Sequence, residues 1–241
     1  MDTAAARRTI ESSKKRPRGR PRKTPEDRDD GNRRRQLLSS AARLFRRKGF
    51  GATSTRDIAA AVGMRSGSPF YHFKSKGALL YAVMEEGMRS AIERQEHAIA
   101  ASMREPAQAL DGVQARASES AGRLRILIRN HFDVLLGPGS DFIPVMLYEA
   151  RSITPRQRSA LAQLQSEYEA PWIPVLDALH EGGRLKADVK LARLLMFGAL
   201  NWSAQWYDRR KGASLDELTD AAIALFLADG AGPSDPWGAT P

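Results

Sequence analysis

Apolar side chains recur at helical spacing along most of the chain, beginning with Leu37. Leu37, Ala41 and Phe45 share one helix face, Asn32 precedes them as a candidate N-cap, and Gly49 ends the run. This spacing predicts a first helix of about four turns.

Two shorter helices are expected next. Ser54 and Asp57 have the spacing of a capping box at the start of the second helix, which Gly63 ends. Ser66 is placed to cap a third helix that reaches Phe73. Two short helices joined by a glycine-containing turn are typical of a helix-turn-helix unit, whose second helix enters the DNA major groove.

The rest of the chain also reads as helical. Alternating Val/Ile/Thr runs with Asn-Gly or Asp-Gly turns are missing, so the sequence gives no case for a sheet. Pro171 and Pro174 must kink or split one of the later helices. The expected helices are Ser75 to about Pro106, Leu124 to Gly137, Phe142–Arg151, Thr154 to Gly182 with Pro155 at its first position, Asp188 to Tyr207, and Ser214 to Leu227 with a capping box to Glu217.

We therefore predict an all-α protein: an N-terminal three-helix helix-turn-helix DNA-binding domain and a larger C-terminal helical domain, for which the family resemblance given below implies ligand binding and dimerisation. Residues 1–31 are polar and basic and are expected to be disordered when free. The DNA-binding domain spans 32–76, the larger domain 77–229, and a loose tail 230–241.

Charge distinguishes the two parts. The net charge is +10, but residues 1–76 carry +14 and the remainder −4, as expected for a phosphate-binding head on a near-neutral body. A basic solubilising tail is the alternative.

With no cysteine and four scattered histidines, we expect no metal site, cofactor or thiol chemistry. The chain shows no membrane span or signal peptide, so a cytoplasmic location is expected.

The head resembles the TetR family of regulators. The resemblance covers roughly residues 33–84 and rests on Ala52-Thr53-Ser54-Thr55-Arg56-Asp57-Ile58-Ala59, Gly63, and Gly67-Ser68-Pro69-Phe70-Tyr71-His72-Phe73-Lys74-Ser75-Lys76. It implies base contacts by Arg65, Ser66 and Ser68 at the start of the recognition helix. It implies phosphate contacts by Ser54, Thr55, Arg56, Tyr71, His72, Lys74 and Lys76. Ordinary helix packing is the alternative role for Tyr71.

The N-terminal arm contains a second DNA-binding pattern. Arg16-Pro17-Arg18-Gly19-Arg20-Pro21-Arg22-Lys23 resembles the core of an AT-hook. Arg18, Gly19, Arg20 and Arg22 would then lie in a narrow A·T minor groove, where the potential is most negative. A non-specific polycation that strengthens phosphate binding is the alternative.

In the larger domain, residues 198–207 are similar to TetR members that sense acyl-CoA thioesters or related lipid and steroid catabolites. The ligand-binding candidates are Phe132, Met146, Glu149, Tyr168, Trp172, Asn201, Trp202, Gln205 and Trp206. A dimer core is the alternative role for Trp206. The resemblance also implies a homodimer formed through the last long helices, because paired heads read the two half-sites of a palindromic operator.

These features predict a transcriptional regulator, most simply a repressor that a small-molecule ligand releases from its operator, rather than an enzyme. Whether it represses or activates is left open by the sequence. Two other hypotheses stay open: a nucleoid-like protein that binds A/T-rich DNA without effector control, and an enzyme with an attached DNA-binding head.

Overall fold

The computed structural model describes residues 30–64, 73–102, 112–210 and 212–228. Within these ranges the chain forms helices joined by turns, without strands, which confirms the predicted all-α class. The helices are α1 (Asp30–Ala52), α2 (Thr55–Ala61), α4 (Lys76–Ser102), α5 (Val113–Leu136), α6 (Phe142–Glu149), the 3₁₀ turn η2 (Ala150–Ser152), α7 (Pro155–Glu169), α8 (Trp172–Glu181), α9 (Val189–Trp206) and α10 (Leu215–Phe226).

Several predicted features lie outside the described residues. They are the AT-hook-like arm with Arg18, Gly19, Arg20 and Arg22, the third helix with Arg65, Ser66, Ser68, Tyr71 and His72, and the tail 230–241.

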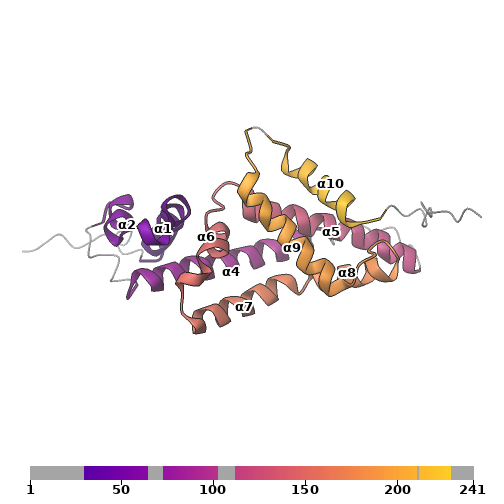
Figure 1. The fold of residues 1–241 in the computed structure, drawn as a ribbon, viewed down its shortest axis with the longest axis horizontal. Helices are drawn as coiled ribbons and strands as arrows, with labels where there is room; N and C mark the ends of the chain where they lie inside the picture. Colours follow the sequence, from indigo (N-terminus) through magenta and orange to yellow (C-terminus); the bar gives the residue numbers. More distant parts are fainter. Residues whose placement is uncertain (1–29, 65–72, 103–111, 211, 229–241) are drawn as a thin grey trace, which may run out of the picture.

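Helices α1 and α2 form a small head at one end of an elongated molecule (Figure 1). Phe45 of α1, Ile58 of α2 and Leu80 of α4 are fully or almost fully buried in its core. Helix α4 then runs 27 residues, about 40 Å, from the head into the larger helical body. The head and body are thus joined by one continuous helix.

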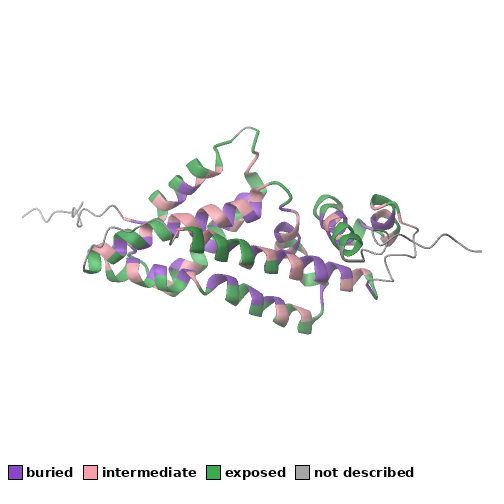
Figure 2. Ribbon diagram, turned by 180° about the vertical axis from the view of Figure 1, so that it is seen from behind, coloured by how far each residue is buried: buried purple, intermediate pink, exposed green. Residues whose placement is uncertain are grey.

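The body is built around α5, which packs against α4, α8 and α10. Helix α7 lies along α4, and α9 lies on α8 and α5. Buried residues line the inward faces of these helices (Figure 2), with Phe132, Trp172 and Leu176 among the most completely buried. Burial of apolar area is the main stabilising force for such a bundle.

Side-chain caps and special residues set most helix boundaries. Reciprocal capping boxes start α2 with Ser54 and Asp57, α7 with Thr154 and Gln157, and α10 with Ser214 and Glu217. The hydrogen bond that the Ser54 backbone N–H donates lowers the pKa of the Asp57 carboxyl below its ordinary value. Pro171 separates α7 from α8, as the sequence predicted.

Three predicted boundaries need correction. Helix α1 begins at Asp30, so Asn32 lies inside the helix and does not cap it. Helix α5 begins at Val113, 11 residues before the predicted start at Leu124. Gly49, with φ of 80°, breaks the helical path of α1 where the sequence predicted the run to end, and residues 50–52 follow the break. The α-helix expected at Phe142–Arg151 ends at Glu149 and is followed by a 3₁₀ turn. The spacing of apolar residues did not distinguish the α-helix from the 3₁₀ turn.

Candidate functional site

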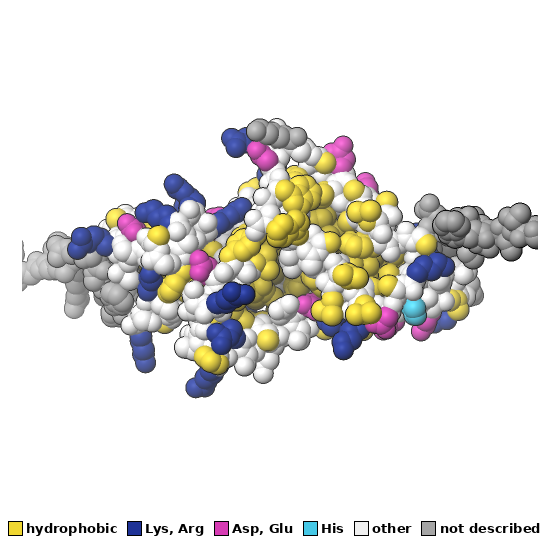
Figure 3. All heavy atoms as spheres, in the orientation of Figure 1, with side chains coloured by type: hydrophobic (Ala, Val, Ile, Leu, Met, Phe, Trp, Pro, Cys, Tyr) yellow, Lys and Arg dark blue, Asp and Glu magenta, His cyan; other side chains and the backbone are white. Residues whose placement is uncertain are grey.

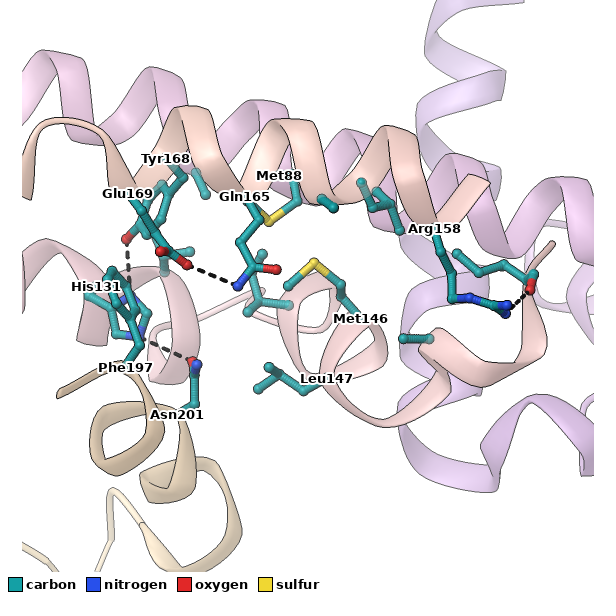
Figure 4. Close-up of a pocket in the computed structure, with 17 residues that line it drawn as sticks. Met88, His131, Met146, Leu147, Arg158, Gln165, Tyr168, Glu169, Phe197 and Asn201 are labelled. Carbon is teal, nitrogen blue, oxygen red and sulfur yellow. Dashed lines mark hydrogen bonds between the residues drawn. The ribbon is translucent and has the colours of Figure 1, made fainter. Parts of the chain in front are cut away.

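A cavity of about 330 Å³ lies inside the body, bounded by α4, α5, α6, α7 and α9. Most of its wall is apolar, and Figure 4 shows Met88, Met146 and Leu147 pointing into its middle. Its volume falls at the lower end of the range of roughly 300–1,000 Å³ for small-molecule pockets. The polar lining residues are few and lie mostly toward its two ends: His131, Arg158, Gln165, Tyr168, Glu169 and Asn201.

One end of the pocket carries a chain of hydrogen bonds. His131 Nδ1 lies 3.0 Å from the Tyr168 hydroxyl, and His131 Nε2 lies 3.2 Å from Asn201 Oδ1. Burial lowers the pKa of His131 to about 4, a shift that the Asn201 hydrogen bond partly opposes. The imidazole is therefore neutral near pH 7 and acts as a hydrogen-bonding link. Burial likewise raises the pKa of the Tyr168 hydroxyl.

Aromatic packing holds this polar chain in place. Phe197 lies 4.6 Å, centroid to centroid, from Trp172 and 5.4 Å from His131. The Trp172 indole N–H donates to Gln95 Oε1 at 2.8 Å, and Gln95 Nε2 donates to the Tyr168 carbonyl at 2.8 Å. Gln95 therefore satisfies buried polar groups where α7 and α8 separate, and anchors that junction to α4.

The charged groups of the pocket lie apart from each other. Glu169 lies near His131 at one end, where it accepts hydrogen bonds from Arg193 and from Gln165. Arg158 lies toward the other end and donates to the Ile153 carbonyl at 2.7 Å (Figure 4). Because Arg193 balances Glu169 and His131 is neutral, Arg158 leaves the pocket with a net positive charge.

Helix α6 connects the pocket to the head. The Phe50 backbone N–H, freed from the helical pattern by the Gly49 break, donates to Glu149 Oε1 at 2.8 Å. Arg46 of α1 pairs with Asp141 at 3.1 Å, just before α6 begins. These contacts tie α1 to both ends of α6.

A second cavity of about 210 Å³ lies between α1, α4 and the start of α6. Ala91, Val134 and Ile143 line both this cavity and the 330 Å³ pocket. We call these three residues the shared wall. A molecule that fills the pocket presses on side chains that also border the head.

The described DNA-contact candidates of the head differ in their exposure and in the contacts that they make. Ser54, Arg56 and Lys74 are exposed and Thr55 is half-buried. The Ser54 hydroxyl caps α2. Lys76, in contrast, donates through Nζ to the carbonyls of Phe50 at 2.8 Å and Thr53 at 2.9 Å and lies over the Phe50 ring. Lys76 thus fastens α4 to the end of α1, and its phosphate contact stays a prediction.

The structure brings only some of the ligand-binding candidates together. Met146, Tyr168 and Asn201 line the pocket. Phe132 and Trp172 are buried outside its lining, and Glu149 faces the head. Trp202, Gln205 and Trp206 project from the exposed face of α9.

The sequence analysis missed His131, Arg158 and Phe197 as pocket residues. A histidine on the apolar face of the helix predicted around Leu124–Leu135 was the available signal for His131.

Exposed apolar side chains also gather over α9 and α10 (Figure 3). Leu195 is 68% exposed, Trp202 64% and Trp206 58%, and Leu191 and Leu194 belong to the same helix. We call these five residues the α9 face. An apolar patch of this kind is typical of a protein–protein interface.

No helix in the described ranges is long and apolar enough to cross a membrane.

The helical head and the body with its pocket have the two-part organisation of a DNA-binding transcriptional regulator with a ligand-binding domain. Two family models match: "Bacterial regulatory proteins, tetR family" over residues 37–83 and "Tetracyclin repressor-like, C-terminal domain" over residues 117–229. The chain belongs to the TetR family.

Individual proteins resemble it over most of its length. The HTH-type transcriptional repressor KstR2 of Rhodococcus jostii (strain RHA1) is 25% identical over 211 residues, which cover 85% of this chain and 96% of KstR2. The crystal structure of superantigen PfiT is 33% identical, covers 80% of this chain and 95% of PfiT, and has a TM-score of 0.61. The crystal structure of AibR in complex with isovaleryl coenzyme A and operator DNA is 20% identical and has a TM-score of 0.68. The match covers 81% of this chain and 98% of AibR.

Proposed function

We propose that the chain is a homodimeric repressor that binds a palindromic operator and is released when an acyl-CoA or a related lipid or steroid catabolite enters the pocket. The shared wall carries this proposal, because it borders both the ligand cavity and the cavity beside the head. The repressor name of KstR2 and the isovaleryl coenzyme A bound to AibR support the direction of regulation and the ligand class.

Release follows from a difference in affinity between two arrangements of the head. A ligand shifts such an equilibrium only as far as it binds one arrangement better than the other. Filling the pocket moves Ile143 at the start of α6, whose two ends hold α1 through Asp141 and Glu149. A small displacement of α6 therefore changes the orientation of the head.

The α9 face supplies the dimer contact. Gly198 lies in the same helix with open space beside its Cα, which allows close approach of a partner helix. Two copies related by a two-fold axis would bury this apolar face and present two heads to one operator. Trp202, Gln205 and Trp206 then serve the dimer and not the pocket.

In this proposal Ser54, Thr55, Arg56 and Lys74 bind phosphates, together with Tyr71 and His72. Arg65, Ser66 and Ser68 read bases, and Arg18, Gly19, Arg20 and Arg22 enter the minor groove. The protein acts in the cytoplasm by binding rather than by catalysis.

The test is selection of the full chain on random DNA duplexes, followed by titration of the enriched duplex with isovaleryl-CoA and decanoyl-CoA. We expect a palindrome bound about 1,000-fold more tightly than scrambled DNA, and release by an acyl-CoA. Deletion of residues 1–23 is expected to weaken A/T-flanked sites more than G/C-flanked sites, and an equal loss would assign the arm a purely electrostatic role.

Two results would contradict the proposal. Equal affinity for enriched and scrambled duplexes, with the same steep salt dependence, would indicate a nucleoid-like A/T-rich DNA-binding protein. Specific binding that saturating acyl-CoA leaves unchanged would remove the proposed ligand class.

A further inference from the structure

We propose that the pocket selects an amphipathic acyl thioester that lies along α7, with a hydrogen-bond-accepting oxygen of its apolar body on Asn201 and its thioester end at Arg158, which faces the anionic CoA group outside the pocket. This inference rests on the proposed function, and names which acyl ligands the site distinguishes. It is carried by the placement of Asn201 and Arg158 toward opposite ends of the pocket, with Met146 and Leu147 between them (Figure 4). The Gln165 amide, which also lies between the two ends, donates to Glu169.

The inner end of the pocket is organised to donate hydrogen bonds. When the Tyr168 hydroxyl donates to His131 Nδ1, the neutral ring carries its proton on Nε2 and donates it to Asn201 Oδ1. The Asn201 amide oxygen is then the acceptor of this bond, and because Asn201 lines the pocket, its amide N–H groups remain to donate to a ligand. A ketone or hydroxyl oxygen on the ligand satisfies these donors, whereas a bare alkyl end leaves them unpaired.

The outer end favours an anion. Arg158 lies in the first turn of α7, where the N-terminal end of the helix dipole adds to its positive charge. Arg158 lines the cavity and is also exposed, so it lies at the side of the pocket that opens to solvent. Glu169 is 11 residues further along α7 and is balanced by Arg193, so no uncompensated carboxylate opposes a bound anion.

The length of the site limits the ligand. Arg158 and Glu169 are separated by about 16 Å along the helix axis, at 1.5 Å per residue. A cavity of about 330 Å³ over this length holds a medium-length acyl chain or a compact ring system. The nucleotide part of a CoA thioester would therefore lie beyond Arg158, in solvent.

Four probes separate these features: decanoyl-CoA, 9-oxodecanoyl-CoA and the neutral methyl esters of the two acids. Affinity is measured on the full chain by calorimetry. We expect 9-oxodecanoyl-CoA to bind several-fold to tenfold more tightly than decanoyl-CoA, and each thioester more tightly than its ester. Arg158→Gln is expected to weaken both thioesters several-fold, through loss of the positive charge that attracts the CoA phosphates, and to weaken the esters less.

Three further variants complete the test. Arg156→Gln is the matched control for Arg158, because Arg156 is exposed in the same helix and does not line the pocket. Asn201→Asp replaces the donor group by an acceptor of the same shape, and is expected to abolish the preference for the oxo compound. Asn201→Leu removes the donor without adding charge and is expected to have the same effect on the preference. Circular dichroism establishes that each variant is folded.

The inference is overturned if none of the probes binds, if oxo and plain thioesters bind equally, or if Arg156→Gln causes the same loss as Arg158→Gln. Its failure is distinguishable from that of the proposed function. Equal binding of the two thioesters, with release of the operator by both, would overturn the selection of the oxygen and leave the regulator intact.

Discussion

His131 illustrates how position changes the behaviour of a side chain. It lies on α5 in contact distance of Tyr168 and Asn201, and burial lowers its pKa from 6.5 to about 4. In the unfolded chain the imidazole regains its ordinary pKa. The unfolded state therefore binds more protons than the folded state between about pH 6.5 and pH 4, and stability falls as the pH drops through this interval.

We expect the free energy of unfolding to decrease by about 2 kcal/mol between pH 7 and pH 5 because of His131 alone. His131→Gln keeps a hydrogen-bonding side chain that does not titrate, so this part of the pH dependence disappears. Urea unfolding at both pH values, at one protein concentration, measures the effect. His97→Gln is the control, because His97 is exposed. Equal pH dependence in the wild-type chain and in His131→Gln would contradict the assignment.

The sequence predicted only some of the residues that line the pocket. Tyr168 and Asn201 were predicted as ligand-binding candidates, and both line the pocket. Arg158 and His131 were not, because nothing in local spacing shows that residues from α5 and α7 face one cavity. The family resemblance implied a phosphate contact for Lys76, but the carbonyls of Phe50 and Thr53 that it contacts could not be predicted without the path of the chain after Gly49.

At the scale of elements, α6 depends on close packing against α4. A Cβ added at Gly87 would lie 2.6 Å from the Cβ of Phe142, the first residue of α6. That distance is too short for two carbon atoms, and the neighbouring atom belongs to the rigid start of a side chain. Glycine at position 87 therefore sets how near α6 lies to α4.

We expect Gly87→Ala to lower the free energy of unfolding by about 1–3 kcal/mol, because α6 must move away from α4. Gly122→Ala is the matched control: a Cβ at Gly122 of α5 meets open space, and alanine in a helix is expected to stabilise by up to about 1 kcal/mol. Urea unfolding of both variants gives the comparison. A loss of the same size in both would mean that the Phe142 contact is not the cause.

Helix boundaries set by a cap or a proline were well predicted, whereas the start of α5, expected near Leu124, lies at Val113. Three helices start through short-range hydrogen bonds of Ser54, Thr154 and Ser214. Pro171 separates two helices for steric reasons. Each of these boundaries can therefore be predicted from a few consecutive residues. The link between Phe50 and Glu149 joins positions 99 residues apart. Such contacts depend on the packing of whole helices and are not encoded in local pattern.

For the whole molecule, the proposed dimer contact through the α9 face sets the state in which the protein acts. Leu195→Arg is expected to produce monomers, because an unpaired charge in the middle of an apolar interface is strongly unfavourable. Loss of the second head lowers operator affinity at least about a hundredfold. Sedimentation velocity and operator titration measure the two effects.

Ile173→Arg provides the control for Leu195→Arg. Ile173 is also exposed and apolar, but it lies on α8 outside the α9 face. Leu195→Arg dimers that still bind the operator tightly would show that the partner contact lies elsewhere.

The shared wall also bears on how new specificities arise. Ala91, Val134 and Ile143 come from α4, α5 and α6, whereas Arg158, Gln165 and Glu169 come from α7. In the proposed mechanism the two groups that choose a molecule, Arg158 on α7 and Asn201 on α9, therefore belong to other helices than the shared wall. Substitution at these two positions would retune the chemical preference while the shared wall keeps its side chains, so they are the positions at which to build biosensors for other metabolites.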